Sequence, residues 1–299
     1  MSKVVVFGGS GFLGSYIVSE LVERNSFDEV VVFDMSDLPV TFKEGVSYIK
    51  GNILDEDSVN DIIKGADVVY NLAAMMDLQD CIQYPVDAVK FNTLGNTIIL
   101  QACVNNGVKR FIFSSSVYAY NSVGGIYAST KRASEDIIKN YSKYYGMNYT
   151  ILQYGTLYGT GSQKGNSIYK YLNSAIKNNV IEYVGDGTEV REYIHVIDAA
   201  KLSVDILDQQ YENKTIIITG HHPTKVADLF RMIQEMIPSD ISIRYKTDTP
   251  VGKKDTHYKV TPYSHLKELP LKMTNNCYVD LGVGLLQLIN YIELEKDKT

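Results

Sequence analysis

The stretch Val4–Gly14 reads VVVFGGSGFLG, an apolar run that leads into a turn rich in glycine. A strand, a glycine turn and a helix in this order direct main-chain N–H groups and the positive end of the helix dipole toward a pyrophosphate. The pattern therefore predicts a dinucleotide site, and the residues expected to hold the cofactor are Gly8, Gly11, Phe12, Leu13 and Gly14.

Asp34 ends the next apolar run, about 20 residues beyond the last glycine of the turn, which is the usual distance for a ribose-binding carboxylate. A carboxylate there accepts hydrogen bonds from the adenosine ribose and repels a 2′-phosphate, so NAD is favoured over NADP. The alternative is that Asp34 only starts a turn continued by Ser36 and Asp37.

Apolar runs and amphipathic segments alternate along the first half of the chain, which predicts an α/β fold with a doubly wound parallel sheet of the Rossmann type. The expected strands are Lys3–Gly8, Glu29–Asp34, Val46–Lys50, Ala66–Leu72, Lys109–Ser114 and Tyr149–Tyr154. The expected helices are Gly11–Arg24, Asp55–Lys64, Pro85–Asn106 and Tyr127–Tyr145.

The rhythm of the sequence changes after Gly155, where loops surround further helical segments. We expect residues 1–160 to form the NAD-binding Rossmann domain. Residues 161–299 are expected to form mainly a smaller substrate-binding region, with some segments that return to the first domain.

Tyr127 and Lys131 lie four residues apart in YASTK, on one face of an expected helix. An ammonium so close to a phenol favours the phenolate and tunes it for proton transfer. Together with a dinucleotide site, this pair indicates hydride chemistry on an alcohol or a ketone.

Composition narrows the class of partner. The net charge of −6 over 299 residues argues against a nucleic-acid-binding protein and favours a small-molecule substrate. The three cysteines have no metal-ligand spacing and are expected to be reduced packing thiols, so we assign no metal and expect a cytoplasmic protein. No apolar stretch reaches the length of a membrane span.

With these features in place, residues 3–205 resemble the extended short-chain dehydrogenase/reductases, the family of nucleotide-sugar epimerases and dehydratases. Further segments match that family in order: GNILD at Gly51, NLAA at Asn71, FNTLGNT at Phe91, FSSSVYA at Phe113, YGTLYG at Tyr154 and VREYIHVID at Val190. The resemblance implies further cofactor contacts at Asn52, Ile53, Leu72, Ala73, Ala74, Asn92, Tyr127, Lys131 and Tyr154.

The resemblance also implies a catalytic serine, and three adjacent serines compete for that role. Family members carry Ser or Thr three residues before a Val-Tyr pair, and counting back from Val117 gives Ser114. Ser114, Tyr127 and Lys131 form the expected catalytic set, in which Ser114 holds the sugar oxygen and Tyr127 takes its proton. Ser115 is the reserve candidate and is otherwise expected to contact the substrate.

Departures from the family pattern narrow the reaction. Dehydratases of the family place Asp and Glu directly after the catalytic Ser/Thr, where this chain has Ser115 and Ser116, so dehydration is not expected. Thr156 and Met76 replace an asparagine and a lysine found in related enzymes, and the segment from Ser114 to Tyr127 is shorter than usual.

Arg191 in VREYIHVID is the expected partner of the substrate diphosphate, because a guanidinium pairs with phosphate oxygens. The alternative is a surface arginine paired with Glu189 or Glu192. His195, in the same motif, lies in an apolar stretch and is interpreted as structural.

We therefore expect an NAD-dependent enzyme that oxidises the C4 hydroxyl of a nucleotide-linked sugar. Epimerisation at C4 is the first expectation and net oxidation to a 4-keto sugar is the second. A non-catalytic sensor or scaffold that binds the dinucleotide is the alternative from another class. Apolar residues on more than one face of the helices Pro85–Asn106 and Tyr127–Tyr145, including Ile98, Ile99, Ile137, Ile138, Tyr141 and Tyr145, predict a homodimer.

Overall fold

A computed structural model describes residues 2–36, 45–120, 124–162, 164–247 and 270–296. The chain divides into two compact units. Unit 1 comprises residues 1–154, 200–218 and 263–273, and unit 2 comprises residues 155–199, 219–262 and 274–299. In the alternative interpretation, Asp34 starts a turn that continues through Ser36 and Asp37. Asp37 lies outside the described residues.

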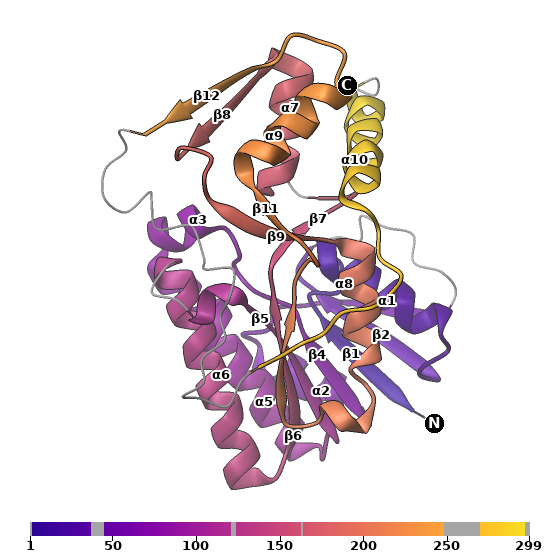
Figure 1. Ribbon diagram of the computed structural model, residues 1–299. Coiled ribbons are helices and arrows are strands. Elements are labelled where there is room, and N and C mark those ends of the chain that lie inside the picture. Colours follow the sequence, from indigo (N-terminus) through magenta and orange to yellow (C-terminus); the bar gives the residue numbers. More distant parts are fainter. Residues whose placement is uncertain (1, 37–44, 121–123, 163, 248–269, 297–299) are drawn as a thin grey trace. The chain divides into compact units, whose positions relative to one another are not determined.

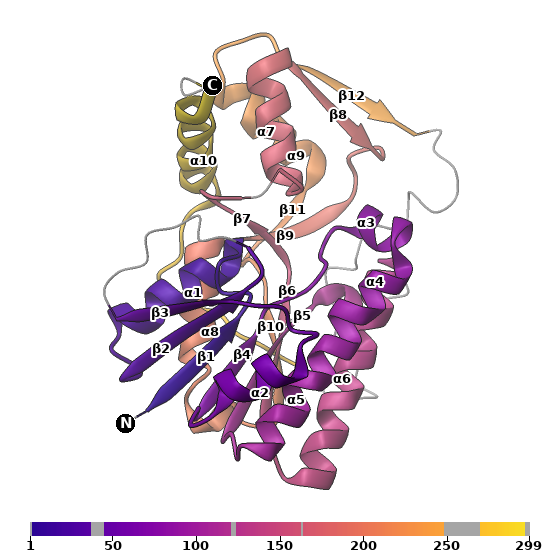
Figure 2. The same ribbon diagram turned by 180° about the vertical axis from the view of Figure 1, so that it is seen from behind.

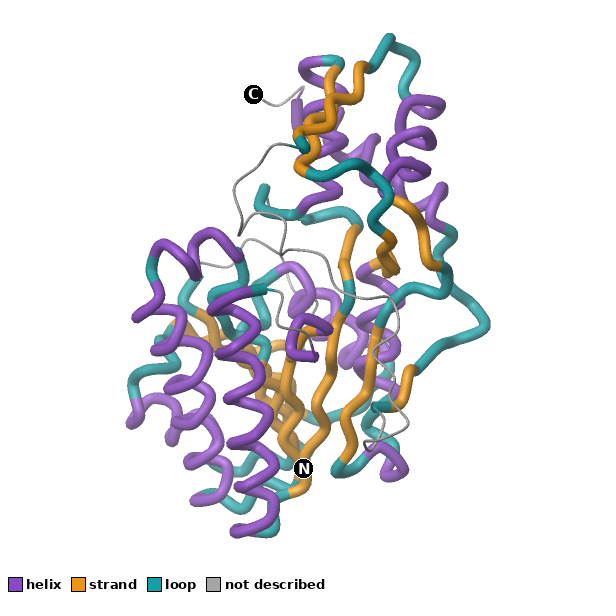
Figure 3. The backbone as a smooth tube through the Cα atoms, turned by 60° about the vertical axis from the view of Figure 1, so that its left-hand side comes forward, coloured by secondary structure: helices purple, strands orange, loops and turns teal. Residues whose placement is uncertain are grey.

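Unit 1 is built on an eight-stranded sheet in the order β13-β10-β6-β5-β4-β1-β2-β3, and every pairing in it is parallel. The order β3-β2-β1-β4-β5-β6 within it is that of a dinucleotide-binding fold, and Figures 1 and 3 show the strands side by side. The strands are β1 (Lys3–Phe7), β2 (Glu29–Asp34), β3 (Val46–Lys50), β4 (Val68–Asn71), β5 (Arg110–Ser116), β6 (Asn148–Tyr154), β10 (Lys214–Ile218) and β13 (Leu271–Lys272).

Helices cover both faces of this sheet, as the opposite views of Figures 1 and 2 show. One face carries α2 (Glu56–Ile63), α5 (Asn96–Asn105) and α6 (Gly125–Tyr145). The other carries α1 (Phe12–Glu23) and the part of α8 (Val196–Asp205) that belongs to unit 1. The sequence prediction of a doubly wound parallel sheet is confirmed.

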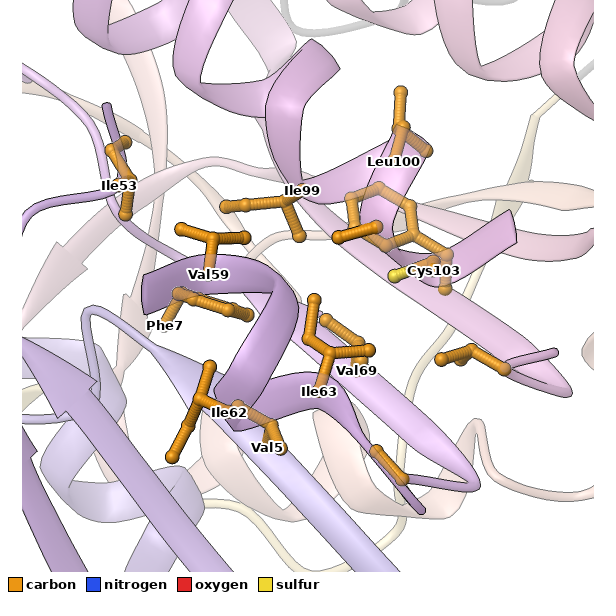
Figure 4. Packing of buried hydrophobic residues seen from close by; sticks show 14 of the residues in the cluster. Val5, Phe7, Ile53, Val59, Ile62, Ile63, Val69, Ile99, Leu100 and Cys103 are labelled. Atoms are coloured by element: carbon orange, nitrogen blue, oxygen red, sulfur yellow. The ribbon is translucent and has the colours of Figure 1, made fainter. Parts of the chain in front are cut away.

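The core between the sheet and the first set of helices is apolar and closed to solvent. Val5 and Phe7 of β1 alternate with residues of the opposite face, as a strand requires, and pack with α2 residues such as Val59 and Ile63. Figure 4 shows this packing, with Ile99 and Leu100 of α5 beside it. The cluster fixes α5 and α6 against the sheet, and α6 carries the expected Tyr127 and Lys131.

The segment predicted as one helix, Pro85–Asn106, is three elements in the structure: α4 (Pro85–Val89), a π-helical segment η1 (Lys90–Gly95) and α5. The Asn92 side-chain amide forms hydrogen bonds with the main chain of Met75, which lies outside the helix. The Ser134 hydroxyl donates to the Asn92 main-chain oxygen. Inserted π turns of this kind often lie at functional sites. Two helices were not predicted, α3 (Leu78–Gln83) and α10 (Leu281–Lys296).

Unit 2 has its own core, formed by apolar side chains of its helices and short sheets. A three-stranded sheet has the order β11-β9-β7, and β12 pairs with β8. The elements of unit 2 are β7 (Thr156–Tyr158), α7 (Ser167–Asn178), β8 (Val180–Val184), β9 (Val190–His195), β11 (Pro223–Lys225), α9 (Val226–Met236), β12 (Ser242–Lys246) and α10. Unit 1 also contains two short 3-10 turns, at Val117–Tyr120 and Gln209–Tyr211. Among the described helices, none combines the length and the apolar character that crossing a bilayer needs.

Candidate functional site

The glycine turn lies between β1 and α1, and two of its glycines are required by packing. A Cβ on Gly14 would lie 2.3 Å from the Gly8 carbonyl oxygen, and one on Gly8 would lie 2.6 Å from the Ala73 nitrogen. Gly8 also has a φ of +76°, which favours glycine. These contacts bring the turn against the NLAA segment.

Gly11 differs from these two glycines, because the nearest atom to an added Cβ is the Gly8 oxygen at 3.2 Å and its backbone is extended. It is the N-cap of α1 and supplies no side-chain cap, and the first turn of α1 has no acidic residue. The buried Ser10 hydroxyl beside it has no partner among the described residues. Open N–H groups and an orphaned hydroxyl at the positive end of a helix fit the pyrophosphate of a dinucleotide.

Asp34 lies at the end of β2, and both carboxylate oxygens accept main-chain hydrogen bonds. Oδ2 accepts from Ser10 N at 3.0 Å and Oδ1 accepts from Ser36 N at 3.0 Å. The structure therefore contains the turn contact with Ser36 and also ties Asp34 to the glycine turn. A carboxylate has further lone pairs, so these bonds leave acceptor capacity for ribose hydroxyls.

The other residues expected at the cofactor follow the ends of β3 and β4. Leu72 N donates to the Phe7 oxygen, and Ala73 N donates to the Asn71 side chain. Asn52 is exposed, whereas Ile53 is buried in the core of unit 1. Ala74 is half-buried in the segment after β4.

Two of the expected cofactor residues have their polar atoms engaged within the protein. Asn92 accepts from Met75 N and donates to the Met75 oxygen and to Thr130 Oγ1. The Tyr154 hydroxyl bonds Ser203 Oγ at 2.6 Å. Both side chains thus brace the surrounding loops and helices.

Tyr127 lies in the first turn of α6, and Lys131 follows one turn later. Lys131 is 2 % exposed, and its Nζ donates to the Ser114 main-chain oxygen at 2.7 Å. The same Nζ lies 4.8 Å from the centre of the Phe113 ring and 5.8 Å from that of Tyr127. Burial lowers the pKa of Lys131 to about 8, while the charge of Glu135 acts in the opposite direction.

The pKa of Tyr127 is not lowered as expected from the proximity of Lys131. Burial raises the pKa of Tyr127, and a hydrogen bond with Ser116 opposes that rise. The physical reason is that burial removes the hydration of the phenolate, while the Lys131 ammonium donates to the Ser114 carbonyl and not to the phenol oxygen.

The three serines at the end of β5 have different partners. Ser114 contributes its main-chain oxygen to Lys131, and Ser115 Oγ donates to Glu135 Oε1 at 2.5 Å. Ser116 Oγ accepts from Tyr118 N at 3.3 Å, and the Ser116 side chain lowers the pKa of Tyr127. Sequence reasoning did not single out Ser116 or Glu135. The carboxylate of Glu135 occurs four residues after Lys131, and that spacing was the available signal.

The expected substrate residues Thr156 and Arg191 belong to unit 2. Thr156 is half-buried on β7, opposite Tyr193 of β9. Arg191 hydrogen-bonds Tyr183, whose pKa is raised by burial. His195 is buried, packs edge-on against Tyr158 at 5.1 Å, and burial lowers its pKa to about 4, as a structural histidine requires.

Comparison with known proteins identifies the family. The model of the NAD dependent epimerase/dehydratase family matches residues 4–219, and the chain belongs to this family. The predictions of the family, of its enzymatic class and of NAD as cofactor are confirmed.

Individual relatives cover almost the whole chain. A Methanocaldococcus jannaschii protein, provisionally named a UDP-glucose 4-epimerase, is 28% identical over 97% of this chain and 98% of its own. A UDP-N-acetylglucosamine 4-epimerase from Methanobrevibacter ruminantium, solved with UDP-N-acetylmuramic acid, has a TM-score of 0.81 and 25% identity, covering 100% of this chain and 99% of that one. The fold is also that of the Thermotoga maritima UDP-glucose 4-epimerase solved with UDP-glucose, with a TM-score of 0.83, 24% identity and coverage of 98% and 99%.

Proposed function

We propose that this enzyme is a nucleotide-sugar 4-epimerase that acts on a UDP-linked sugar. The observation that carries the proposal is the buried Lys131 ammonium, held by the Ser114 oxygen one helical turn from Tyr127. Such a pair suits removal and return of a proton at a sugar hydroxyl. The names of the relatives support UDP as the nucleotide and C4 as the reacting carbon.

In this proposal the Tyr127 oxygen takes the proton of the C4 hydroxyl and later returns it. In the protein without ligands, burial outweighs any effect of Lys131 on the Tyr127 pKa. The Lys131 cation is proposed to stabilise the phenolate when it forms during the transfer, while a serine hydroxyl holds the sugar oxygen. NAD, when bound, supplies the hydride acceptor. Asp34 and the glycine turn are proposed to hold it, and Arg191 is proposed to pair with the substrate diphosphate.

Ser116 is a stronger candidate for the serine role than Ser114, because its side chain lowers the pKa of Tyr127 while Ser114 meets Lys131 through the main chain. This choice preserves the argument against dehydration. The residues that follow Ser116 are Val117 and Tyr118, and neither is a carboxylate that could remove the C5 proton.

Net oxidation at C4 is the second candidate, favoured by the departures at Thr156 and Met76. Met76 is 52% exposed at the position where related enzymes carry a lysine. An apolar side chain therefore replaces a charged one at this expected substrate contact.

The experiment that tests the proposal incubates the purified protein with UDP-, GDP- and dTDP-sugars and identifies products by mass spectrometry and NMR. Stoichiometric substrate should give a transient rise in nicotinamide absorbance, followed by a sugar inverted at C4. A stable reduced cofactor with a keto product would replace epimerisation by net oxidation. No absorbance change and no product with any sugar would leave the sensor or scaffold alternative.

A further inference from the structure

Glu135 is a buried carboxylate that the proposed chemistry does not use. Tyr127, Lys131 and Glu135 follow one another at intervals of four residues, so they share one face of α6. The residue is 6% exposed. Its Oε1 accepts from Ser115 Oγ at 2.5 Å and from Gln153 Nε2 at 2.7 Å.

These contacts connect α6 with the ends of two strands. Ser115 lies on β5 between the two serines that meet Lys131 and Tyr127, and Gln153 lies beside it on β6. A buried carboxylate is costly unless hydrogen bonds and an opposite charge stabilise it. Ser115 and Gln153 supply the hydrogen bonds, and Lys139, four residues further along α6, supplies an opposite charge.

We propose that Glu135 is a positioning residue that keeps Lys131 in its cationic form and fixes the serine-bearing end of β5. The inference rests on the proposed function for the meaning of that cation, but the charge coupling itself does not require turnover. Ser115, expected from the sequence to contact substrate, is here the hydrogen-bond donor that holds Glu135.

The charged and titratable groups around the pair come from several elements. The charge of Glu135 favours the Lys131 cation, whereas burial opposes it. Burial raises the pKa of the nearby Cys81 thiol of α3 to about 11, so this thiol is uncharged where Lys131 titrates. For Glu135, burial raises the carboxyl pKa, and the bonds from Ser115 and Gln153 and the charge of Lys139 act against that rise. Asp136 adds to the rise, although its side chain is exposed.

The test measures the titration of Lys131 by NMR in the full chain labelled at lysine Cε, with and without NAD. Loss of one signal in Lys131→Arg assigns it. The midpoint should lie near 8 in the native protein and fall by about one unit or more in Glu135→Gln, because an opposite charge is removed from a buried amine. Asp136→Asn is the matched control, since it removes the same charge from the exposed neighbour, and its midpoint should stay native.

Equal midpoints in Glu135→Gln and Asp136→Asn would overturn the inference. If Glu135→Gln does not fold, the native protein provides the test, because protonation of Glu135, followed at its Cδ signal, should produce a matching inflection in the Lys131 signal. Absence of that shared inflection would also overturn it. A Tyr127→Phe variant that keeps its activity would refute the proposed function. The effect of Glu135 on the titration of Lys131 could still be measured in that case.

In an active enzyme, Glu135→Gln should also shift the alkaline fall of kcat to lower pH, because Lys131 loses its proton earlier. If Glu135 had only a structural role, Glu135→Gln would lower kcat at every pH without shifting the pH at which kcat falls on the alkaline side.

Discussion

The ammonium of Lys131 donates to the main-chain oxygen of Ser114 at 2.7 Å, so the cation of α6 is held by the backbone of β5. A main-chain acceptor cannot be removed by substitution of a side chain. The position of the charge therefore depends on where β5 ends, and the side chains at that end are free to serve other partners.

Tyr127→Phe should reduce turnover by at least about 100-fold, because it keeps the ring and removes the proton-transfer group. Binding of NAD should stay close to native. The control is Tyr141→Phe on the same helix, whose lost hydroxyl bonds Gln101 at 3.1 Å on the exposed side. Steady-state rates decide the matter, and a near-native rate for Tyr127→Phe would mean that another group transfers the proton.

Lys131→Met should impair both turnover and NAD affinity, since this lysine is an expected cofactor contact as well as a catalytic residue. The variant also removes a buried charge, so thermal unfolding should be measured beside calorimetric NAD binding. Unchanged NAD affinity in a folded variant would restrict Lys131 to the proton-transfer step.

The serines give a sharper comparison within one strand. Ser116→Ala removes the hydroxyl that lowers the pKa of Tyr127, so kcat should fall by about 10- to 100-fold, the range for a lost hydrogen bond to a charged group. Ser114→Ala should stay within a few-fold of native because the carbonyl that holds Lys131 remains. The reverse order of effects would return the catalytic role to Ser114, the residue predicted from the sequence.

The sequence predicted the sheet, the glycine turn and the Tyr-Lys spacing because each depends on local periodicity or on residues close in the chain. The choice among the serines depends on how β5 meets α6, which is a relation between elements distant in sequence. The π-helical segment Lys90–Gly95 likewise depends on Asn92 bonding Met75 outside its helix. Glu135 looked like an ordinary helix carboxylate until the structure placed Ser115 and Gln153 against it.

Asp34→Ala should weaken the preference for NAD(H) over NADP(H), because the carboxylate that repels a 2′-phosphate is lost. The change also removes the acceptor of Ser10 N, so some loss of affinity for both cofactors is expected. Asp34→Asn separates the two effects, since the amide keeps an acceptor and lacks the charge. Equal affinities of the native protein for both cofactors would contradict the assignment.

A homodimer is expected, but through residues different from some of those named from the sequence. Ile99 and Ile138 are fully buried in unit 1 and are not available to a partner. Val86 and Val89 of α4 are 64% and 51% exposed, which is costly for apolar side chains in water. Light scattering at micromolar concentration should give a dimer mass, and Val86→Asp with Val89→Asp should give a monomer. A native protein of monomer mass would refute the dimer.

The glycine turn allows the demands of folding to be separated from those of the cofactor. Gly14→Ala places a Cβ 2.3 Å from the Gly8 oxygen and should destabilise the protein by about 1–3 kcal/mol, the range for overpacking. Gly11→Ala adds a methyl group where the backbone already suits alanine and the nearest oxygen is 3.2 Å away, so the folded state should change little. That methyl group would, however, stand at the N-terminus of α1, where the pyrophosphate is expected. Chemical denaturation should thus register Gly14→Ala, whereas calorimetric titration with NAD should register Gly11→Ala in a fully folded protein. Native NAD affinity in Gly11→Ala would show that the cofactor does not approach the helix at this point.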